Sequence, residues 1–97
     1  MSANKKLLTP MVDNGFISSL EGTLKELEIT KNALAVEAKV RPATINDLVT
    51  GNAKQVNFET LKAVIDALNR KSLENGAGKR FSIEDVFIYN PNKKDSE

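Results

Sequence analysis

The chain has 97 residues, of which 40% are apolar and 28% are charged, and its formal net charge is +1. This length and composition suit one small globular domain. Cysteine and histidine are both absent, which excludes disulfides, thiolate or imidazole metal sites, and the Ser-His and Cys-His nucleophile systems. The balanced charge does not by itself indicate a nucleic-acid partner, so any partner must be inferred from motifs.

The ends of the chain are polar. The segment MSANKKLLTPMVDN carries two lysines but only a short apolar run before Pro10, so it fails as a signal peptide. No apolar run approaches the length of a membrane span. We therefore expect a cytoplasmic protein with a flexible arm at 1–14, a domain at 15–90 and a disordered tail at 91–97.

The first periodic segment is FISSLEGTLKELEI. Its apolar residues recur at spacings of three and four, which predicts a helix at about 16–28. Gly22 lies inside this stretch and lowers its helix propensity. The apolar stripe consists of Phe16, Ile17, Leu20, Leu24 and Leu27.

Two short helices are predicted next, with almost no loop between them. Thr30 can cap a helix at 31–38, because its hydroxyl can accept from a free N–H of the first turn. Pro42 disfavours helical geometry in the residue before it, yet fits the first turn of a new helix at 42–50. The inward-facing residues are Leu34, Ala35, Ala38, Ile45, Leu48 and Val49. Such a pair, joined by a short turn, is typical of a helix-turn-helix that holds its second helix outward.

The rest of the chain predicts two more helices. Gly51 ends the helix at 42–50, and Asn57 can cap another, whose stripe comprises Phe58, Leu61, Val64, Ile65 and Leu68. Residues 69–81 are polar and contain glycine, so we expect a loop there. Ser82 and Asp85 resemble a capping box that opens a short helix at 83–88. With no strand pattern of useful length, the expected fold is all-α with five helices.

Three further stretches each have a functional and a structural interpretation. NGAGKR at 75–80 resembles a phosphate loop but lacks the full spacing, so a flexible loop is the better interpretation. Glu84 and Asp85 fit helix capping better than a cation site. Lys5 and Lys6 fit a disordered arm better than a DNA contact. The apolar run 87–89 either closes the core or makes a dimer contact, and the sequence does not separate these.

Residues 29–69 resemble the Cro/repressor-type (XRE-like) helix-turn-helix domain. The matching features are Leu34 with Ala35, the block VRPATIND, Gly51, the helix FETLKAVIDAL and the later segment FSIEDVF. The resemblance covers about residues 16–88. It implies a five-helix, lambda-repressor-like domain that binds operator DNA, commonly as a dimer, and regulates transcription.

The resemblance also implies roles for individual residues. Those that match the base-facing start of the second motif helix are Arg41, Pro42, Ala43, Thr44, Asn46 and Asp47. Those on the phosphate side are Lys31, Lys39, Thr50, Asn52 and Lys54. The implied partner is double-stranded DNA, with the chain as a homodimer. We expect no cofactor, metal ion, membrane or small-molecule ligand.

Several residues depart from the family pattern. Lys39 replaces the glycine usual in the turn, and a left-handed backbone there would cost it on the order of 1 kcal/mol. Pro42 and Ala43 offer only apolar contact to a base, such as to a thymine methyl. Asp47 could accept from cytosine but would repel phosphate, and a surface charge is its more ordinary role. Direct base readout is therefore expected from Arg41, Thr44 and Asn46.

The leading hypothesis is a sequence-specific DNA-binding repressor of bacterial or phage type, with no catalytic activity. An alternative is a protein-interaction module on the same fold, such as an antitoxin or antirepressor, which the near-zero net charge would favour. The two differ in whether salt-dependent DNA binding is lost on Arg41→Ala. A small enzyme has little support, because no nucleophile or carboxylate constellation is evident.

Overall fold

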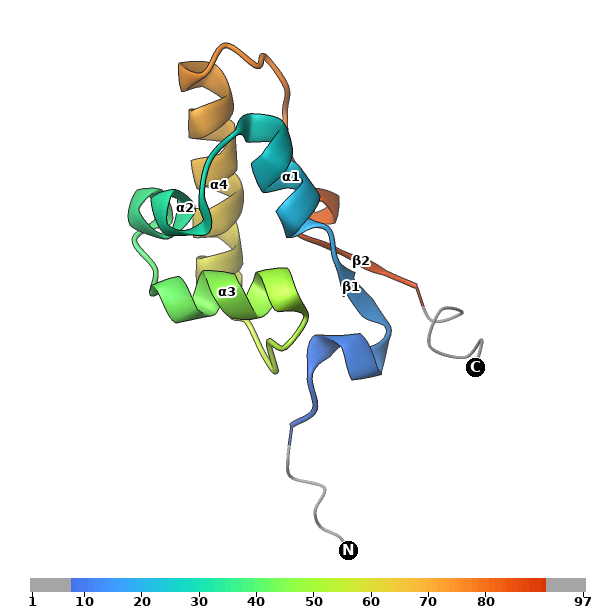
Figure 1. The fold of residues 1–97 in the computed structure, drawn as a ribbon. Coiled ribbons are helices and arrows are strands. Elements are labelled where there is room, and N and C mark those ends of the chain that lie inside the picture. The colour runs from blue at the N-terminus through green and yellow to red at the C-terminus, as the bar shows by residue number, and fades with distance from the viewer. Residues whose placement is uncertain (1–7, 91–97) are drawn as a thin grey trace, which may run out of the picture.

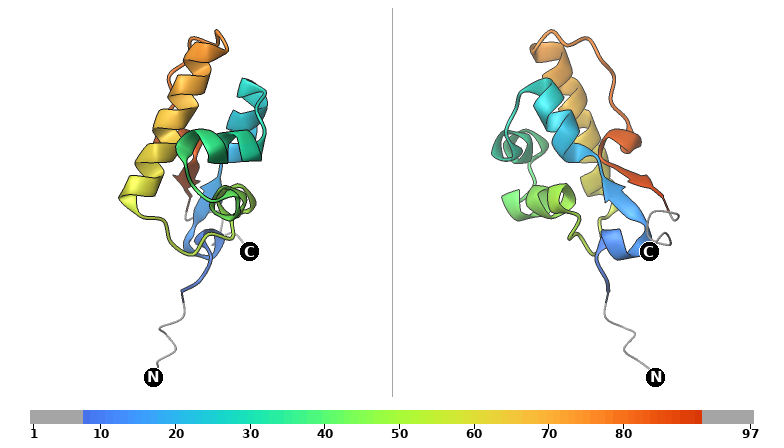
Figure 2. Two further views of the ribbon diagram at one scale, coloured as in Figure 1. Left: turned by 90° about the vertical axis from the view of Figure 1, so that its left-hand side faces the viewer. Right: turned by 45° about the vertical axis from the view of Figure 1, so that its right-hand side comes forward.

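The computed structural model describes residues 8–90, so Lys5, Lys6 and the tail expected at 91–97 lie outside the described residues. In chain order the elements are the 3-10 helix η2 (Met11–Asn14), β1 (Phe16–Ser18), α1 (Leu20–Leu27), α2 (Lys31–Ala38), α3 (Pro42–Thr50), α4 (Phe58–Glu74), the 3-10 helix η3 (Ile83–Asp85) and β2 (Phe87–Tyr89). The long helix α4 forms the back of the domain. Helices α2 and α3 lie in front of α4, and the small sheet lies beyond the end of α3 on the side away from α2 (Figures 1 and 2).

The two ends of the domain form a sheet that the sequence pattern did not predict. Strands β1 and β2 pair antiparallel with Ile17 opposite Ile88, so the predicted helix at 16–28 is wrong at its start. Ser19 separates the strand from the helix, since its N–H donates to the Val86 carbonyl at 3.0 Å. Aromatic and β-branched residues favour a pleated surface when a partner strand is available, and that partner lies about 70 residues away.

Helices α2 and α3 begin and end at the residues that the sequence predicted. Thr30 Oγ1 accepts from the Ala33 N–H at 2.9 Å, and Pro42 occupies the first turn of α3. Gly51, with φ 85°, ends α3 in the left-handed conformation. Caps and glycine stops are local signals, which is why these boundaries can be predicted from sequence.

The loop expected at 69–81 is wrong over its first half, because α4 continues to Glu74. Asn69 explains the extension: its side chain accepts from the Phe81 N–H at 2.7 Å and donates to the Phe81 carbonyl at 3.1 Å. Ser72, buried on the same helix, bonds both the N–H and the carbonyl of Lys79. Polar residues that suggested a loop therefore lie on α4 and hold the returning chain.

The final helix expected at 83–88 is also wrong. Residues 83–85 form one 3-10 turn, and the chain then enters β2. The capping box of Ser82 and Asp85 is present as predicted, so the turn starts where expected but does not continue. Among the described residues there are four α-helices rather than five.

The core is aliphatic with one buried aromatic residue. Its fully buried members include Leu20, Leu34, Ile45, Val64, Leu68, Phe81 and Val86. These residues come from all four α-helices and from both sides of η3, so the helix-turn-helix rests on a scaffold that includes the end of the chain. Part of the segment expected as a free arm is attached to it as well, because the Met11 N–H donates to the Ala53 carbonyl at 2.7 Å.

Candidate nucleic-acid interface

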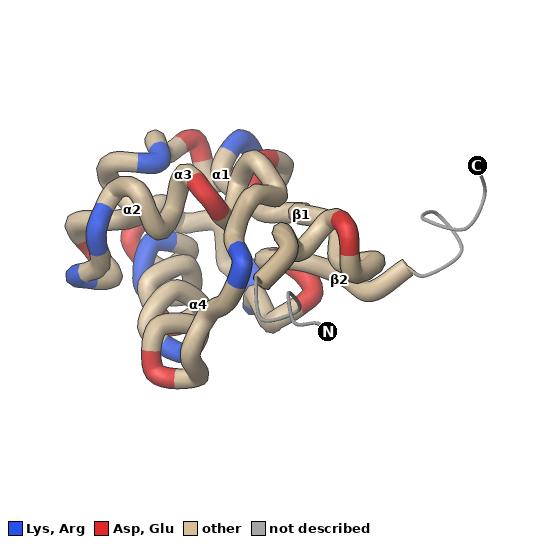
Figure 3. Tube along the Cα trace, turned by 90° about the horizontal axis from the view of Figure 1, so that it is seen from below, with Lys and Arg blue, Asp and Glu red and all other residues tan. Residues whose placement is uncertain are grey.

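Helix α3 is held by its inner face and exposed along its outer face. Ile45 and Leu48 are 0% and 1% exposed and pack in the core. In Figure 3 the molecule is seen from below, and α3 lies across this side. The residues that the sequence assigned to base contact and that are exposed on α3 and at its cap are Arg41, Pro42, Ala43, Asn46 and Asp47, while Thr44 is half-buried. The structure therefore brings the predicted base-facing residues to one surface.

The turn between α2 and α3 is tight and left-handed at Lys39. Lys39 has φ 61° and ψ 42°, and the next residue, Val40, donates its N–H to the Ala35 carbonyl at 3.0 Å. This is the Schellman arrangement, in which the residue after the left-handed one also packs against the helix, and Val40 does pack on the core. Lys39, which departs from the glycine expected in this turn, thus adopts the left-handed conformation.

One hydrogen bond joins a residue predicted to contact phosphate to a residue predicted to contact bases. Lys31 Nζ, at the start of α2, donates to Asn46 Oδ1 on α3 at 2.9 Å. Nothing in the sequence indicated this bond, because the residues lie 15 positions apart and either could equally face solvent. In the structure this bond points the Asn46 amide oxygen toward Lys31.

The remaining polar residues on the outer face have no such partner. Within the described part of the chain, the Arg41 guanidinium and the Asp47 carboxylate make no hydrogen bond or ion pair. The Asp47 carbonyl, by contrast, accepts from the N–H groups of Gly51, Asn52 and Ala53 at 3.0–3.1 Å. These bonds hold the loop after α3 close to the helix, so Asp47 shapes that loop through its backbone.

The predicted phosphate residues flank α3. Lys31, Lys39, Thr50, Asn52 and Lys54 are all exposed. Figure 3 shows basic positions on both sides of α3 and one acidic position on it, and Asp47 is the only acidic residue of that helix. Gln55, which no sequence pattern indicated, is exposed and lines a hollow beside α3 together with Thr44 and Asn57.

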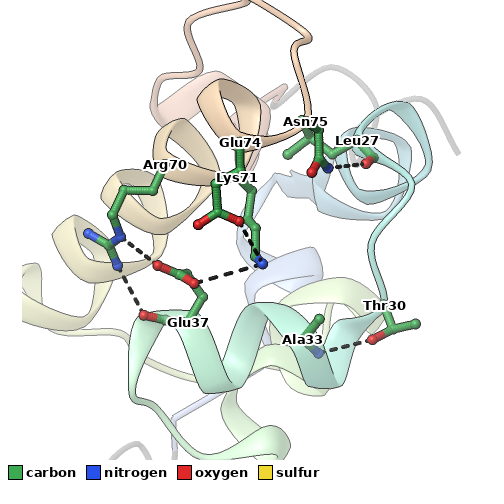
Figure 4. A network of polar contacts seen from close by, with 8 residues as sticks. All are labelled: Leu27, Thr30, Ala33, Glu37, Arg70, Lys71, Glu74 and Asn75. Carbon is green, nitrogen blue, oxygen red and sulfur yellow. Dashed lines mark hydrogen bonds and ion pairs between the residues drawn. The ribbon is translucent and has the colours of Figure 1, made fainter.

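Glu37 of α2 is a second acidic residue near this surface, and basic residues of α4 pair with it. Arg70 of α4 donates to the Glu37 carboxylate at 2.6 Å and to its backbone carbonyl at 3.0 Å, and Lys71 lies 3.9 Å from the same carboxylate (Figure 4). The hydrogen bond from Arg70 is the main reason that the pKa of Glu37 is lowered. Glu37 is therefore a fixed, compensated carboxylate that ties α2 to α4.

The glycine-containing segment at 75–80 is a structural loop. Its lysine, Lys79, pairs with Glu26 at 2.8 Å and lies over the Phe81 ring. Asn75 donates to the Leu27 carbonyl at 3.0 Å (Figure 4). These contacts join the loop to α1 and engage the side chains of Lys79 and Asn75 within the fold.

Two features are absent from the part of the chain that the structure describes. Residues 8–90 contain no group of three or more acidic, histidine or cysteine residues placed to hold a metal ion. No helix in the described part of the chain is long and apolar enough to cross a membrane.

Comparison with known proteins identifies the family. A family model described as the Cro/C1-type HTH DNA-binding domain matches residues 19–71, which is more than half of the chain and includes α1, α2, α3 and most of α4. No curated protein and no solved structure matches significantly. The match coincides with the surface described above and confirms the resemblance seen in the sequence. The chain therefore belongs to the family of Cro/C1-type helix-turn-helix DNA-binding domains.

Proposed function

We propose that this protein is a sequence-specific transcriptional regulator, a cytoplasmic repressor of bacterial or phage type, that inserts α3 into the major groove of operator DNA. The observation that carries the proposal is the outer face of α3, where polar side chains are exposed on a helix whose inner face is locked into the core. An α-helix fits the major groove, where each base pair presents a distinct pattern of donors and acceptors.

Base readout is assigned to Arg41, Thr44 and Asn46. A guanidinium can donate twice to guanine, and a carboxamide can pair with the edge of adenine. The bond from Lys31 supports this role for Asn46, because an amide oxygen has two lone pairs and can accept from Lys31 and from an adenine amino group together. Pro42 and Ala43 provide apolar contact, and Asp47 disfavours any base that places an acceptor opposite it.

The phosphate backbone is assigned to the groups on either side of α3, namely Lys31, Lys39, Thr50, Asn52 and Lys54. Such contacts set the register of the helix on the duplex without reading sequence. Each lysine that neutralises a phosphate adds about 0.9 to the slope of log affinity against log salt. Because one copy offers few cations, we propose a homodimer on a two-fold operator. Repression would follow from occupying that DNA, with no enzymatic step.

The test compares two duplex pools by fluorescence anisotropy across a salt series. One pool is randomised, and the other has been selected on the protein. We expect tight binding to the selected pool that is lost in the variant carrying Arg41→Ala and Asn46→Ala. Arg80→Ala is the matched control, because Arg80 is exposed, has no partner among the described residues, and lies outside the matched region.

The contrary result is weak binding that is equal for both pools and unchanged in the double variant. That result would remove the regulator proposal and favour a protein-interaction module. The apolar start of α3 and the net charge of +1 would then mark α3 as a protein contact.

A further inference from the structure

An apolar groove lies where the small sheet meets the end of α3 and the loop that follows it (Figure 1). Its volume is about 520 Å³, and small-molecule sites in proteins commonly have about 300–1,000 Å³. No sequence pattern indicated this groove, because its residues come from both ends of the domain and from its centre. Part of it, including β1 and β2, lies outside the residues 19–71 that the family model matches. The groove is therefore a feature of this chain that the family match does not account for.

Aromatic rings from the two strands form one wall of the groove. The Phe16 ring lies 5.7 Å from that of Phe87 and 5.0 Å from that of Tyr89, and all three residues line the groove. The antiparallel pairing of Phe16 with Tyr89 holds this cluster together. Tyr89 is 62% exposed, and Phe16 and Phe87 are half-buried, so ring surface is left uncovered. Such surface favours contact with hydrocarbon.

Aliphatic side chains from α3 and the following loop complete the apolar lining. They are Leu48, Ala53 and Val56. The Met11 N–H donates to the Ala53 carbonyl at 2.7 Å, so η2 is attached to the same loop, and Met11 also lines the groove. Leu48 and Ala53 are buried in the core. Because the fold itself holds these walls, a ligand can enter without a rearrangement that would cost binding energy.

One cation lies at this apolar groove. Among the described residues that line it, Lys54 is the only charged one, and none is acidic. The Lys54 ammonium makes no hydrogen bond or ion pair with any other residue of the described range 8–90. Gln55, next to it, is exposed and also lines the groove, and its amide carries two N–H donors. A carboxylate can accept from both groups, and a bond from an ammonium to a carboxylate is among the stronger hydrogen bonds.

We propose that this groove binds a small apolar monocarboxylate, with its hydrocarbon part against the aromatic rings and its carboxylate at Lys54. The lining selects this class of ligand. A polyanion such as a nucleotide would bring several charges to a groove that offers one cation. A peptide would bury backbone N–H and carbonyl groups against apolar side chains that cannot bond them, which is costly. A ligand with one negative charge and an apolar body matches both the charge and the surface of the groove.

Occupation of the groove should oppose DNA binding, a consequence that rests on the proposed function. That function assigns Lys54 to a phosphate of the duplex, and a carboxylate paired with the same ammonium competes with that phosphate. The carboxylate-bound protein should therefore bind the operator about tenfold more weakly, with the salt slope reduced by about 0.9. By linkage, operator DNA should weaken carboxylate binding by the same factor.

The first test titrates the full chain with octanoate, and octan-1-ol is the neutral match. Tyr89 is the only tyrosine of the chain and tryptophan is absent, so tyrosine emission reports on the groove. We expect a saturable change with octanoate, with a dissociation constant about tenfold below that of octan-1-ol, because only the carboxylate forms a fully charged bond with Lys54. Equal dissociation constants, or no saturable change with octanoate below its micelle-forming concentration, would overturn the proposal.

Substitutions of Lys54 test the position of the carboxylate. Lys54→Met keeps an apolar side chain of similar length without the charge, and it should raise the octanoate dissociation constant about tenfold while leaving that of octan-1-ol unchanged. Lys54→Arg keeps the charge and should retain octanoate binding. Lys25→Met is the matched control, because Lys25 is an exposed lysine of α1 that does not line the groove. Octanoate binding that is the same in Lys54→Met and Lys25→Met would contradict the assignment.

Methyl NMR of the wild-type chain locates the hydrocarbon part of the probe. Octanoate should shift the methyl resonances of Leu48 and Val56, which line the groove. The internal controls are Val36 and Leu73, which are 69% and 78% exposed and lie outside the groove. Shifts of equal size at these control residues would show adsorption to any exposed apolar side chain and would overturn the proposal.

The two proposals can fail separately. If the protein selects an operator but octanoate binds no better than octan-1-ol, the regulator proposal stands and the groove proposal fails. If octanoate binds through Lys54 and no operator is selected, the groove proposal stands and the regulator proposal fails. If both bind and octanoate does not weaken operator binding, their opposition is overturned.

Discussion

Polar side chains at the C-terminal end of α4 bond within the fold, whereas polar side chains on the outer face of α3 are mostly left exposed. Asn69 and Ser72 on α4, and Asn75 at its C-cap, each bond the backbone of another segment. On α3, the side chains of Arg41 and Asp47 have no partner among the described residues, and Asn46 has only Lys31. Polar groups that fix the fold are satisfied within it, whereas groups left exposed on a rigid helix are available to an external partner. The stability and binding of matched variants can test this division.

Two asparagines give the largest expected contrast. Asn69→Ala should lower the free energy of unfolding by about 2–4 kcal/mol, because it removes both bonds to the backbone of Phe81 and leaves those groups without a partner. Asn46→Ala should change the same quantity by less than about 0.5 kcal/mol. Urea unfolding measures both variants, and equal destabilisation would remove the distinction between the two regions.

Two arginines make the converse comparison in DNA binding. Arg41→Ala should weaken binding to the selected operator by about 1–3 kcal/mol, the cost of one lost bidentate base contact. Its free energy of unfolding should match that of the wild type, because the side chain of Arg41 has no partner in the described structure. Arg80→Ala should leave both quantities unchanged. A lower free energy of unfolding in Arg41→Ala would show that Arg41 stabilises the fold, as Asn69 does, and would contradict this comparison.

The turn before α3 sharpens the comparison, because it belongs to the fold yet carries a proposed phosphate contact. Lys39→Gly should raise the free energy of unfolding by about 1 kcal/mol, since glycine adopts φ 61° without the strain of a side chain. It should also reduce the salt dependence of operator binding by about 0.9 in slope. Glu28→Gly is the control, because Glu28 has φ 59° and lies away from α3. It should stabilise the protein without altering the salt slope.

The smallest expected effect is the pH dependence of the stability that the ion pair between Glu37 of α2 and Arg70 of α4 contributes. The pKa of Glu37 is lowered in the folded protein, chiefly by the hydrogen bond from Arg70. A lowered folded pKa means that the contribution to stability is present above the ordinary value of 4.5 and is lost as pH falls through the folded pKa. Melting temperatures of wild type and Glu37→Gln should therefore converge as the pH is lowered below that range. A constant difference between them would show that the carboxylate charge is not the cause.

The centre of the domain could be predicted from sequence because its signals are local. Thr30, Pro42, Gly51 and Asn57 each mark a helix boundary through groups within four residues, and the structure has these boundaries as predicted. The candidate site followed in the same way, since its residues lie along one short helix and its flanks. Their exposure in the structure agrees with that placement.

The ends of the domain could not be predicted because their partners are distant in sequence. Phe16 pairs with Tyr89, and Asn69 bonds Phe81 across a loop. A three-residue strand has no periodicity of its own, and an asparagine suggests a loop until the backbone that it bonds is known. The bond from Lys31 to Asn46 was missed for the same reason.

The central claim is that the outer face of α3 reads base sequence, and it is tested most directly by selecting binding sites from a randomised duplex library. Wild type and Asn46→Ala are selected in parallel and the bound DNA is sequenced. We expect a two-fold symmetric motif for the wild type. We also expect the variant to lose its preference at one base-pair position in each half-site and to keep the others. An identical motif from both proteins, or no motif from the wild type, would contradict it.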